Sequence, residues 1–328
     1  MKKKMTFKGI WQLLKDSFKG FSNDRVFKLS GSLAYFTVFS IGPMLLVIIF
    51  FADLFYGREA VEGTIYGQIK GFVGPGAAAQ IQEIIKNASL SGKSNMTAII
   101  GFVTLIVGAT TVFAEIQDSI NTIWNLKTKP ERGWLKMIMN RLLSFSIVVS
   151  LAFLLLVSLI VNGLMEALGN RLQNIFPNIA VIFIYIINLL LTFIVITLLF
   201  AIIFKVLPDA KIKWKDILTG AVTTAILFMI GKFGITFYIG SSHIGTTYGT
   251  AGSIIIILLW IYYSAIILYF GAEFTKSYAA VYGNRIYPND YAVWIKHIDV
   301  EEENGTLKQQ EQQKKEEDDK TGDNIRVT

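Results

Sequence analysis

The chain has no cysteine and only two histidines, His243 and His297. The absence of cysteine excludes disulfides, thiolate metal sites and a cysteine nucleophile. The two histidines lie far apart in the sequence, and neither stands in a spacing typical of metal ligands. We therefore expect no catalytic residues, no metal site and no cofactor, and we expect that the protein is not an enzyme.

Charged residues are also scarce, at 17% of the 328 residues, and no Asp, Glu, Lys or Arg occurs from Phe233 to Ala272. Hydrophobic residues make up 53%, a composition that indicates an integral membrane protein. About 20 apolar residues suffice to cross a bilayer. The apolar runs therefore predict an all-α membrane protein with six transmembrane helices. The expected spans are residues 29–52, 96–114, 141–166, 177–204, 217–240 and 251–274.

The segments around these spans differ in composition. Residues 1–28 are basic and amphipathic, and residues 57–95 predict a helical loop outside the cytoplasm. Residues 29–285 would form the membrane domain, followed by a cytoplasmic tail over 286–328. From residue 299 onward the tail is rich in Glu, Gln and Lys and has few large apolar residues, so we expect most of it to be disordered.

The basic residues predict the orientation. Seventeen Lys and Arg residues fall in the segments on the side of the N-terminus, against five on the opposite side. The positive-inside rule then places both termini in the cytoplasm. A basic body of this kind favours contact with anionic membrane lipids. We expect no nucleic-acid partner, because the basic residues follow the loops rather than forming one patch.

The N-terminal segment contains an apolar pattern at helical spacing. Its members are Phe7, Ile10, Trp11, Leu14, Phe18 and Phe21. Lysines cover other faces of the same helix. This pattern predicts an amphipathic helix lying on the inner membrane surface. A lid packed on the protein is the alternative.

Two of the expected spans carry a polar stripe. In the second span, small and polar residues recur at alternating steps of four and three: Thr97, Gly101, Thr104, Gly108, Thr111, Glu115 and Asp118. In the last span, Tyr262, Tyr269 and Glu273 share one face. The stripes predict either a packing seam between helices or the wall of a polar pathway. The topology places Glu115, Asp118 and Glu273 together near the cytoplasmic level.

Further candidates come from other spans. Lys232 lies in the outer half of the fifth span, where it either extends its ammonium to the interface or faces a cavity and meets an anion. Asn188 lies near the middle of the fourth span and shares a face with Thr192. The first span contains Gly42-Pro43, and proline kinks a helix. The candidate substrate pathway comprises Glu115, Asp118, Glu273, Tyr262, Tyr269, Lys232, Tyr35, Pro43, Thr104, Thr111 and Asn188.

Several of these stretches resemble the YihY/BrkB family of bacterial inner-membrane proteins, formerly labelled ribonuclease BN. They are GSLAYFTVFSIGPMLL, FAEIQDSINTIWNLK followed by RGWLK, LPDAKIKWKDILTGA, and TYGTAGSIIIILLWIYYSAIILYFGAEFTKSYA. The resemblance covers about residues 20–285. It implies six helices with both termini inside, location in the bacterial inner membrane, and a transporter whose proposed substrates include envelope or amphipathic lipids.

Three function classes are relevant to a membrane protein with these features. The polar stripes and the kinked first helix favour a transporter or flippase-like protein for a lipid-like substrate. A non-transporting scaffold of the cell envelope is the alternative, and the acidic tail and the basic helix would then recruit partners. Ribonuclease activity is not expected, because RNA hydrolysis usually needs a metal-binding acid cluster or a histidine pair. Membrane lipids are the expected partners, and no oligomeric state is predicted.

Overall fold

The computed structural model describes residues 6–40, 75–76, 78–80, 82, 95–129, 177–242 and 252–295. Apart from Ile295, they belong to one compact unit, Met1–Trp294. Predictions for residues 41–74 and 130–176, including Pro43 and the third span, lie outside the described residues. So does most of the tail.

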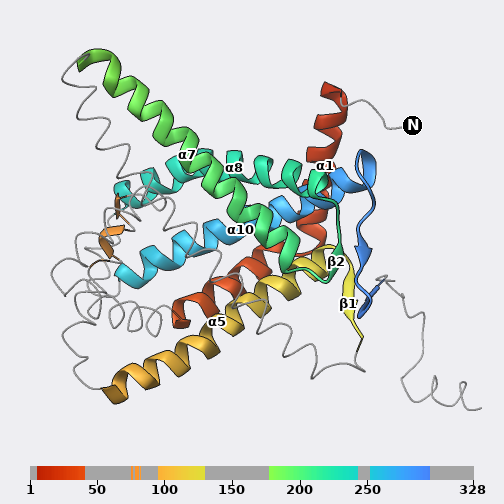
Figure 1. Cartoon of the computed structure of the whole chain (residues 1–328), viewed down its shortest axis with the longest axis horizontal. Coiled ribbons are helices and arrows are strands. Elements are labelled where there is room, and N and C mark those ends of the chain that lie inside the picture. Colours follow the sequence, from red (N-terminus) through yellow and green to blue (C-terminus); the bar gives the residue numbers. More distant parts are fainter. Residues whose placement is uncertain are drawn as a thin grey trace, which may run out of the picture. The chain divides into compact units, whose positions relative to one another are not determined.

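Helices dominate the described part (Figure 1). They are α1 (Phe7–Asn23), a helical segment over residues 26–40, α5 (Asn95–Ile123), α7 (Pro177–Val206), α8 (Trp214–Ser241) and α10 (Gly252–Val281). Three of them contain stretches long and apolar enough to cross a membrane: Ile186–Val206, Trp214–Ser241 and Ile254–Val281. The prediction of six spans stays a prediction beyond these three.

Local signals in the sequence set the helix ends. The hydroxyl of Thr6 accepts a hydrogen bond from the Gly9 N–H at the start of α1. Asn125 has a φ of 56° two residues after the end of α5, a left-handed position that suits asparagine at a helix end. Pro208 follows α7, and proline disfavours helical backbone in the residue before it.

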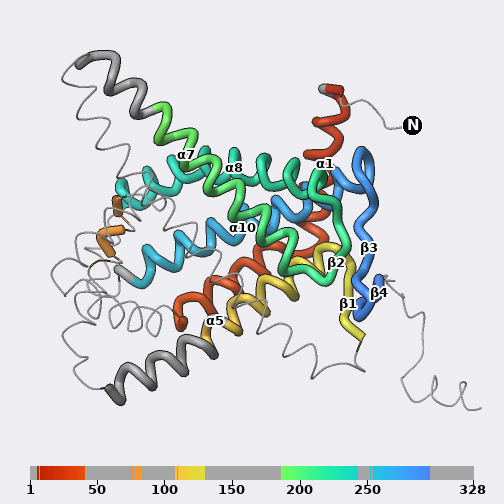
Figure 2. Tube along the Cα trace, in the orientation of Figure 1, coloured from red at the N-terminus to blue at the C-terminus, as the bar shows by residue number. Residues whose placement is uncertain are grey.

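Four short strands form two small sheets that the all-α prediction did not include (Figure 2). Strand β1 (Leu126–Thr128) pairs antiparallel with β4 (Ala292–Trp294). Strand β2 (Ala210–Lys211) pairs antiparallel with β3 (Tyr287–Pro288). The pairs connect the segments that follow α5, α7 and α10. These helix ends therefore lie at one end of the unit, and the mostly helical fold carries a small strand element there.

The contact between α8 and α10 depends on two glycine–threonine pairs. Gly220 of α8 lies against Thr275 of α10, and Gly271 of α10 lies against Thr224 of α8. Each threonine hydroxyl donates to a carbonyl in its own helix, at 2.7 Å in both cases. The polar groups are thus satisfied within each helix, and the absence of a glycine side chain lets the two backbones approach closely.

The outer face of α8 is apolar. Ile226, Ile230, Phe233 and Phe237 are exposed large side chains, with 76% of the Phe237 surface accessible. A water-soluble protein seldom exposes such a continuous apolar face. It is the surface expected of a helix that contacts lipid.

Candidate functional site

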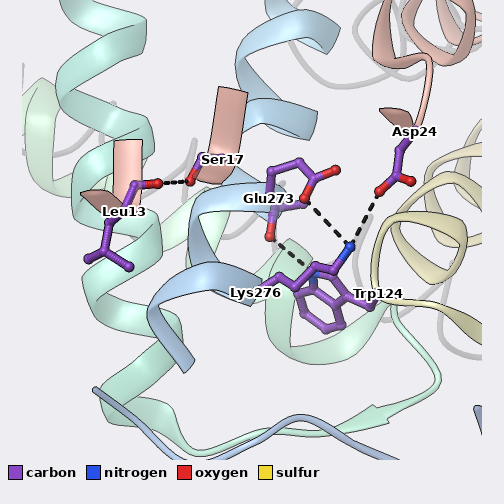
Figure 3. A network of polar contacts seen from close by, with 7 residues as sticks. Leu13, Ser17, Asp24, Trp124, Glu273 and Lys276 are labelled. Atoms are coloured by element: carbon purple, nitrogen blue, oxygen red, sulfur yellow. Dashed lines mark hydrogen bonds and ion pairs between the residues drawn. The ribbon is translucent and has the colours of Figure 1, made fainter. Parts of the chain in front are cut away.

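A partly buried group of charged side chains joins α1 to α10 (Figure 3). The side chain of Glu273 is 1% exposed, and its Oε2 lies 3.7 Å from Nζ of Lys276. The same Nζ lies 3.3 Å from Oδ2 of Asp24, the residue that caps α1. Burying a carboxylate is costly unless a cation and hydrogen bonds compensate for it. Lys276 is therefore shared by two acids that α1 and α10 bring together.

The helix α1 covers this carboxylate. A methyl group placed on Gly20 would overlap the carboxyl of Glu273. Leu13, Ser17 and Phe21 form the buried side of α1, which packs against α10. The apolar face expected from the sequence is thus divided, since Trp11 and Phe18 remain exposed while Leu13, which the pattern omitted, is buried. The lid alternative therefore describes the buried side of α1.

Three oxygens near the contact of α5 and α10 have no hydrogen-bond partner among the described residues. They are Oε1 of Glu273, the hydroxyl of Tyr269 and the hydroxyl of Ser119. The Tyr269 hydroxyl lies beside Ser119 and within electrostatic reach of Glu115. Tyr269 and Ser119 are therefore neighbours without a well-formed hydrogen bond between their hydroxyls. The two predicted stripes therefore meet here through Tyr269.

Trp124 holds the same helices together. Its indole Nε1 donates to the backbone carbonyl of Ala272 over 3.0 Å, in a buried position (Figure 3). In the same view the hydroxyl of Ser17 donates to the carbonyl of Leu13 within α1. This hydrogen bond attaches the end of α5 to α10 directly beside Glu273. The contact between α5 and α10 is therefore closed at this end.

Asp209 forms a second polar centre that sequence reasoning missed. Its buried carboxylate accepts from Gln117 at 2.8 Å, Asn121 at 3.0 Å and Thr128 at 2.9 Å. The Asp209 N–H donates to Oδ1 of Asn121 at 2.9 Å. Gln117 and Asn121 stand four residues apart and so share a face of α5. That spacing, together with an acid directly after Pro208, is the signal that could have located this centre.

Two groups of the C-terminal segment belong to this end of the unit. Burial and the negative charge of Asp209 raise the pKa of Tyr291. The Asn284 N–H donates to the buried carboxylate of Asp216 over 2.9 Å, and Gly283 lies against the same carboxylate. Asp216 also lies in the first turn of α8, where its charge suits the helix dipole.

A recess of about 260 Å³ lies between α7 and α8. Its polar lining is Asn188 and Thr192 from α7 and Lys232 from α8. Its apolar lining is Leu189, Met229 and Phe233. Two residues of the candidate pathway, Asn188 and Lys232, are therefore neighbours around one recess. Lys232 is only partly exposed there.

The remaining candidates do not join this recess. Tyr262 is half-buried and faces Gly31 of the helical segment 26–40, whereas Tyr35 is 58% exposed. Glu115 and Thr111 are half-buried on α5, and Asp118 is exposed. The side chain of Thr104 lies outside the described residues. Within the described ranges no three His, Cys, Asp or Glu side chains gather as a metal site would require.

The chain is similar to a described protein family and to several relatives named as membrane proteins. The family model described as Virulence factor BrkB matches residues 17–290. A UPF0761 membrane protein of Stenotrophomonas maltophilia (strain R551-3) is 28% identical over 270 residues, covering 79% of this chain and 59% of that protein. A UPF0761 membrane protein of Tolumonas auensis is 30% identical over 274 residues, covering 78% of this chain and 81% of that protein.

The chain thus spans about three fifths of the length of the Stenotrophomonas relative. No solved structure matches it.

Proposed function

Since the chain belongs to the Virulence factor BrkB family and its relatives are named as membrane proteins, we propose that it is a membrane transporter or flippase-like protein for an anionic amphipathic substrate. The observation that carries the proposal is the recess between α7 and α8. A lysine, an amide and a hydroxyl line it within two helices that are apolar enough to cross a membrane. Polar groups within a helix that spans a membrane are functional-site candidates.

The chemistry of the lining favours a headgroup with negative charge. The ammonium of Lys232 can donate to phosphate oxygens, and the Asn188 amide and the Thr192 hydroxyl can donate beside it. Leu189, Met229 and Phe233 offer apolar contacts to an acyl chain. A lipid phosphate with its attached chain would satisfy both parts of the lining.

The recess is also far from the strand element. Lys232 stands 18 residues after Trp214, the first residue of α8, or ~27 Å along a helix. Glu273, Lys276 and Asp24 would belong to another part of the pathway, at the end covered by α1. A lipid-like substrate would then meet a cationic group at one end and the acids at the other.

A scaffold remains the second candidate function, and one observation favours it. Trp124 and α1 close the contact of α5 and α10 beside Glu273. A contact that stays closed at this end would serve stability rather than passage. Substrate movement is therefore the property that separates the two candidates.

The test is lipid movement in reconstituted vesicles. The purified chain is placed in phosphatidylcholine vesicles that contain a fluorescent phosphatidylglycerol or a fluorescent phosphatidylcholine, and loss of fluorescence to an impermeant reductant reports movement across the bilayer. We expect the wild type to move the fluorescent phosphatidylglycerol faster than the fluorescent phosphatidylcholine. Lys232→Met should reduce this rate severalfold, whereas Lys215→Met, an exposed lysine at the start of the same helix, should leave it unchanged.

Inorganic phosphate added in excess separates a lipid headgroup from a free anion as the species recognised. Binding of inorganic phosphate without any lipid movement would favour a soluble anionic substrate. Equal rates for the wild type, Lys232→Met and protein-free vesicles, without binding of phosphate, would contradict the proposal and favour the scaffold.

A further inference from the structure

Helix α1 presents three different strips along its length. The buried strip, Leu13, Ser17 and Phe21, packs against α10. Beside it lies an exposed aromatic strip in which Trp11 is 68% and Phe18 is 63% accessible. The lysine strip comes next and is exposed as well; it consists of Lys8, Lys15 and Lys19.

Helical spacing sets the order of these strips. Trp11 and Phe18 are seven residues apart and so lie within ~20° of each other around the helix. Lys15 follows Trp11 by four residues, and Lys19 follows Phe18 by one, so the lysines stand on the side of the aromatic strip that points away from the buried one. The only acid within α1, Asp16, lies beyond the lysines, where it accepts a hydrogen bond from Gln12 at 2.9 Å.

The aromatic strip lies against a helix that could cross a membrane. The ring of Phe18 lies 4.9 Å from the ring of Phe270, which belongs to the apolar stretch Ile254–Val281 of α10. The ring of Phe21 lies near the same ring in a tilted arrangement, with centroids 6.0 Å apart. The aromatic strip is therefore attached, through Phe18, to a helix that is long and apolar enough to cross a bilayer.

We propose that the aromatic and lysine strips of α1 bind the surface of an anionic phospholipid leaflet. Tryptophan is enriched at the boundary between lipid chains and headgroups, where the indole has one apolar and one polar side. Lysines next to such a strip reach the phosphates, and their long carbon chains stay over apolar surface. The buried strip fixes the helix on α10, so the other two strips keep one orientation toward the membrane.

A lipid surface explains the strips better than a protein partner does. A protein groove would contact the aromatic strip and leave an adjacent lysine strip without compensation. A leaflet supplies both environments in the right order, since chains and phosphates lie in successive layers. The surface is separate from the Lys232 recess, so it stands whether or not the protein moves lipid.

The absence of cysteine makes this proposal directly testable. A nitroxide label is attached to the full chain at Trp11→Cys, in the aromatic strip, or at Gln12→Cys, which lies about 100° further around the helix. The labelled protein is studied in nanodiscs of phosphatidylcholine alone or of an equimolar mixture with phosphatidylglycerol. Accessibility to oxygen and to a water-soluble nickel complex reports the depth of each label.

We expect the label at position 11 to be severalfold more accessible to oxygen than to nickel, and the label at position 12 to show the reverse. Phosphatidylglycerol should increase the protection of position 11 from nickel. Substituting Lys8, Lys15 and Lys19 by Gln should remove that increase. The matched control substitutes three exposed lysines elsewhere, Lys127, Lys129 and Lys215, and should retain it.

A label at Ser22→Cys, between the aromatic and lysine strips, repeats the test with Trp11 intact. Equal nickel accessibility at positions 11, 12 and 22 in both lipid mixtures would overturn the proposal. Protection that is unchanged by phosphatidylglycerol and by the lysine substitutions would overturn the role of the lysines. Dipolar broadening between labels at position 11 in detergent would mean that a second copy covers the strip, which also overturns it.

Discussion

The carboxyl of Glu273 lies directly against the backbone of Gly20, so α10 and α1 meet where no side chain fits on the α1 side. Nζ of Lys276 lies 3.7 Å from Oε2 of Glu273 and 3.3 Å from Oδ2 of Asp24, and these two pairs complete the contact. An acid of the polar stripe is therefore covered by the amphipathic helix α1. The position of α1 and the environment of Glu273 depend on each other.

Gly20→Val should displace α1 from α10. The added atoms would overlap the Glu273 carboxyl, and overpacking of a closed contact destabilises by about 1–3 kcal/mol. Thermal unfolding in detergent and proteolysis within α1 measure the effect. Gly234→Val is the matched control, because nothing lies within 4 Å of a Cβ atom added there. Equal behaviour of the two variants would show that α1 does not depend on this contact.

Lys276→Met should destabilise the protein because it leaves two acids without their shared cation. Removing one partner of a fully buried ion pair lowers the free energy of unfolding by about 3–5 kcal/mol. Lys276 is partly exposed, so the expected loss of unfolding free energy is ~1–3 kcal/mol. Adding Glu273→Gln should recover part of the loss, which a double-mutant cycle of unfolding free energies quantifies. Additive effects would argue against the pairing. Lys127→Met, at an exposed site, is the control.

Asp209→Ala should be among the more damaging single substitutions in the described part of the chain. It leaves the donors of Gln117, Asn121 and Thr128 without their acceptor, at about 1–3 kcal/mol for each buried group left unsatisfied. Asp209→Asn keeps one acceptor oxygen and should be milder. Asp290→Asn removes an exposed pair with Lys211 and should change the melting temperature little. Similar losses for Asp209→Ala and Asp290→Asn would contradict this role.

Stability should fall at alkaline pH in part through Tyr291. Burial and Asp209 raise its pKa above the ordinary value of 10.0. The folded state then holds the phenol proton at a pH where the unfolded chain has released it, so stability decreases as the pH rises above about 10. Tyr291→Phe cannot titrate and should lose less stability between neutral and alkaline pH. Parallel pH profiles of the two proteins by thermal unfolding would exclude this contribution.

The long apolar helices were the part of the fold that the sequence predicted well. Long apolar runs predict α7, α8 and α10, because a run of that length has to bury its backbone polar groups in helix when it meets lipid. The strands were missed because each has only two or three residues, too few for a recognisable alternation. They depend on pairing between segments far apart in the chain.

The site was partly within reach of the sequence. Lys232 and Asn188 stood out individually as polar residues in apolar helices, but α7 and α8 are apolar on all faces, so no pattern fixed how the helices are rotated toward each other. Their meeting in one recess required the structure. For α1 the sequence indicated amphipathicity but not that Ser17, a polar residue, lies at the centre of the buried strip, since its hydroxyl is satisfied by Leu13 within the helix.

The hydrogen bonds of Asp209 make one end of the α7–α8 hairpin a fixed hinge. Asp209 accepts hydrogen bonds from Gln117 of α5 and Thr128 of β1. Across the same turn, Nζ of Lys205 donates to the Ile212 carbonyl at 2.6 Å. Any rotation between α7 and α8 about this end is amplified with distance along them. A rotation of about 5° would change the separation by only a few tenths of an ångström near the turn but by ~2 Å at Lys232, given the rise of the helix. The width of the recess is therefore far more sensitive to such a motion than the separation of the two helices at their tied end.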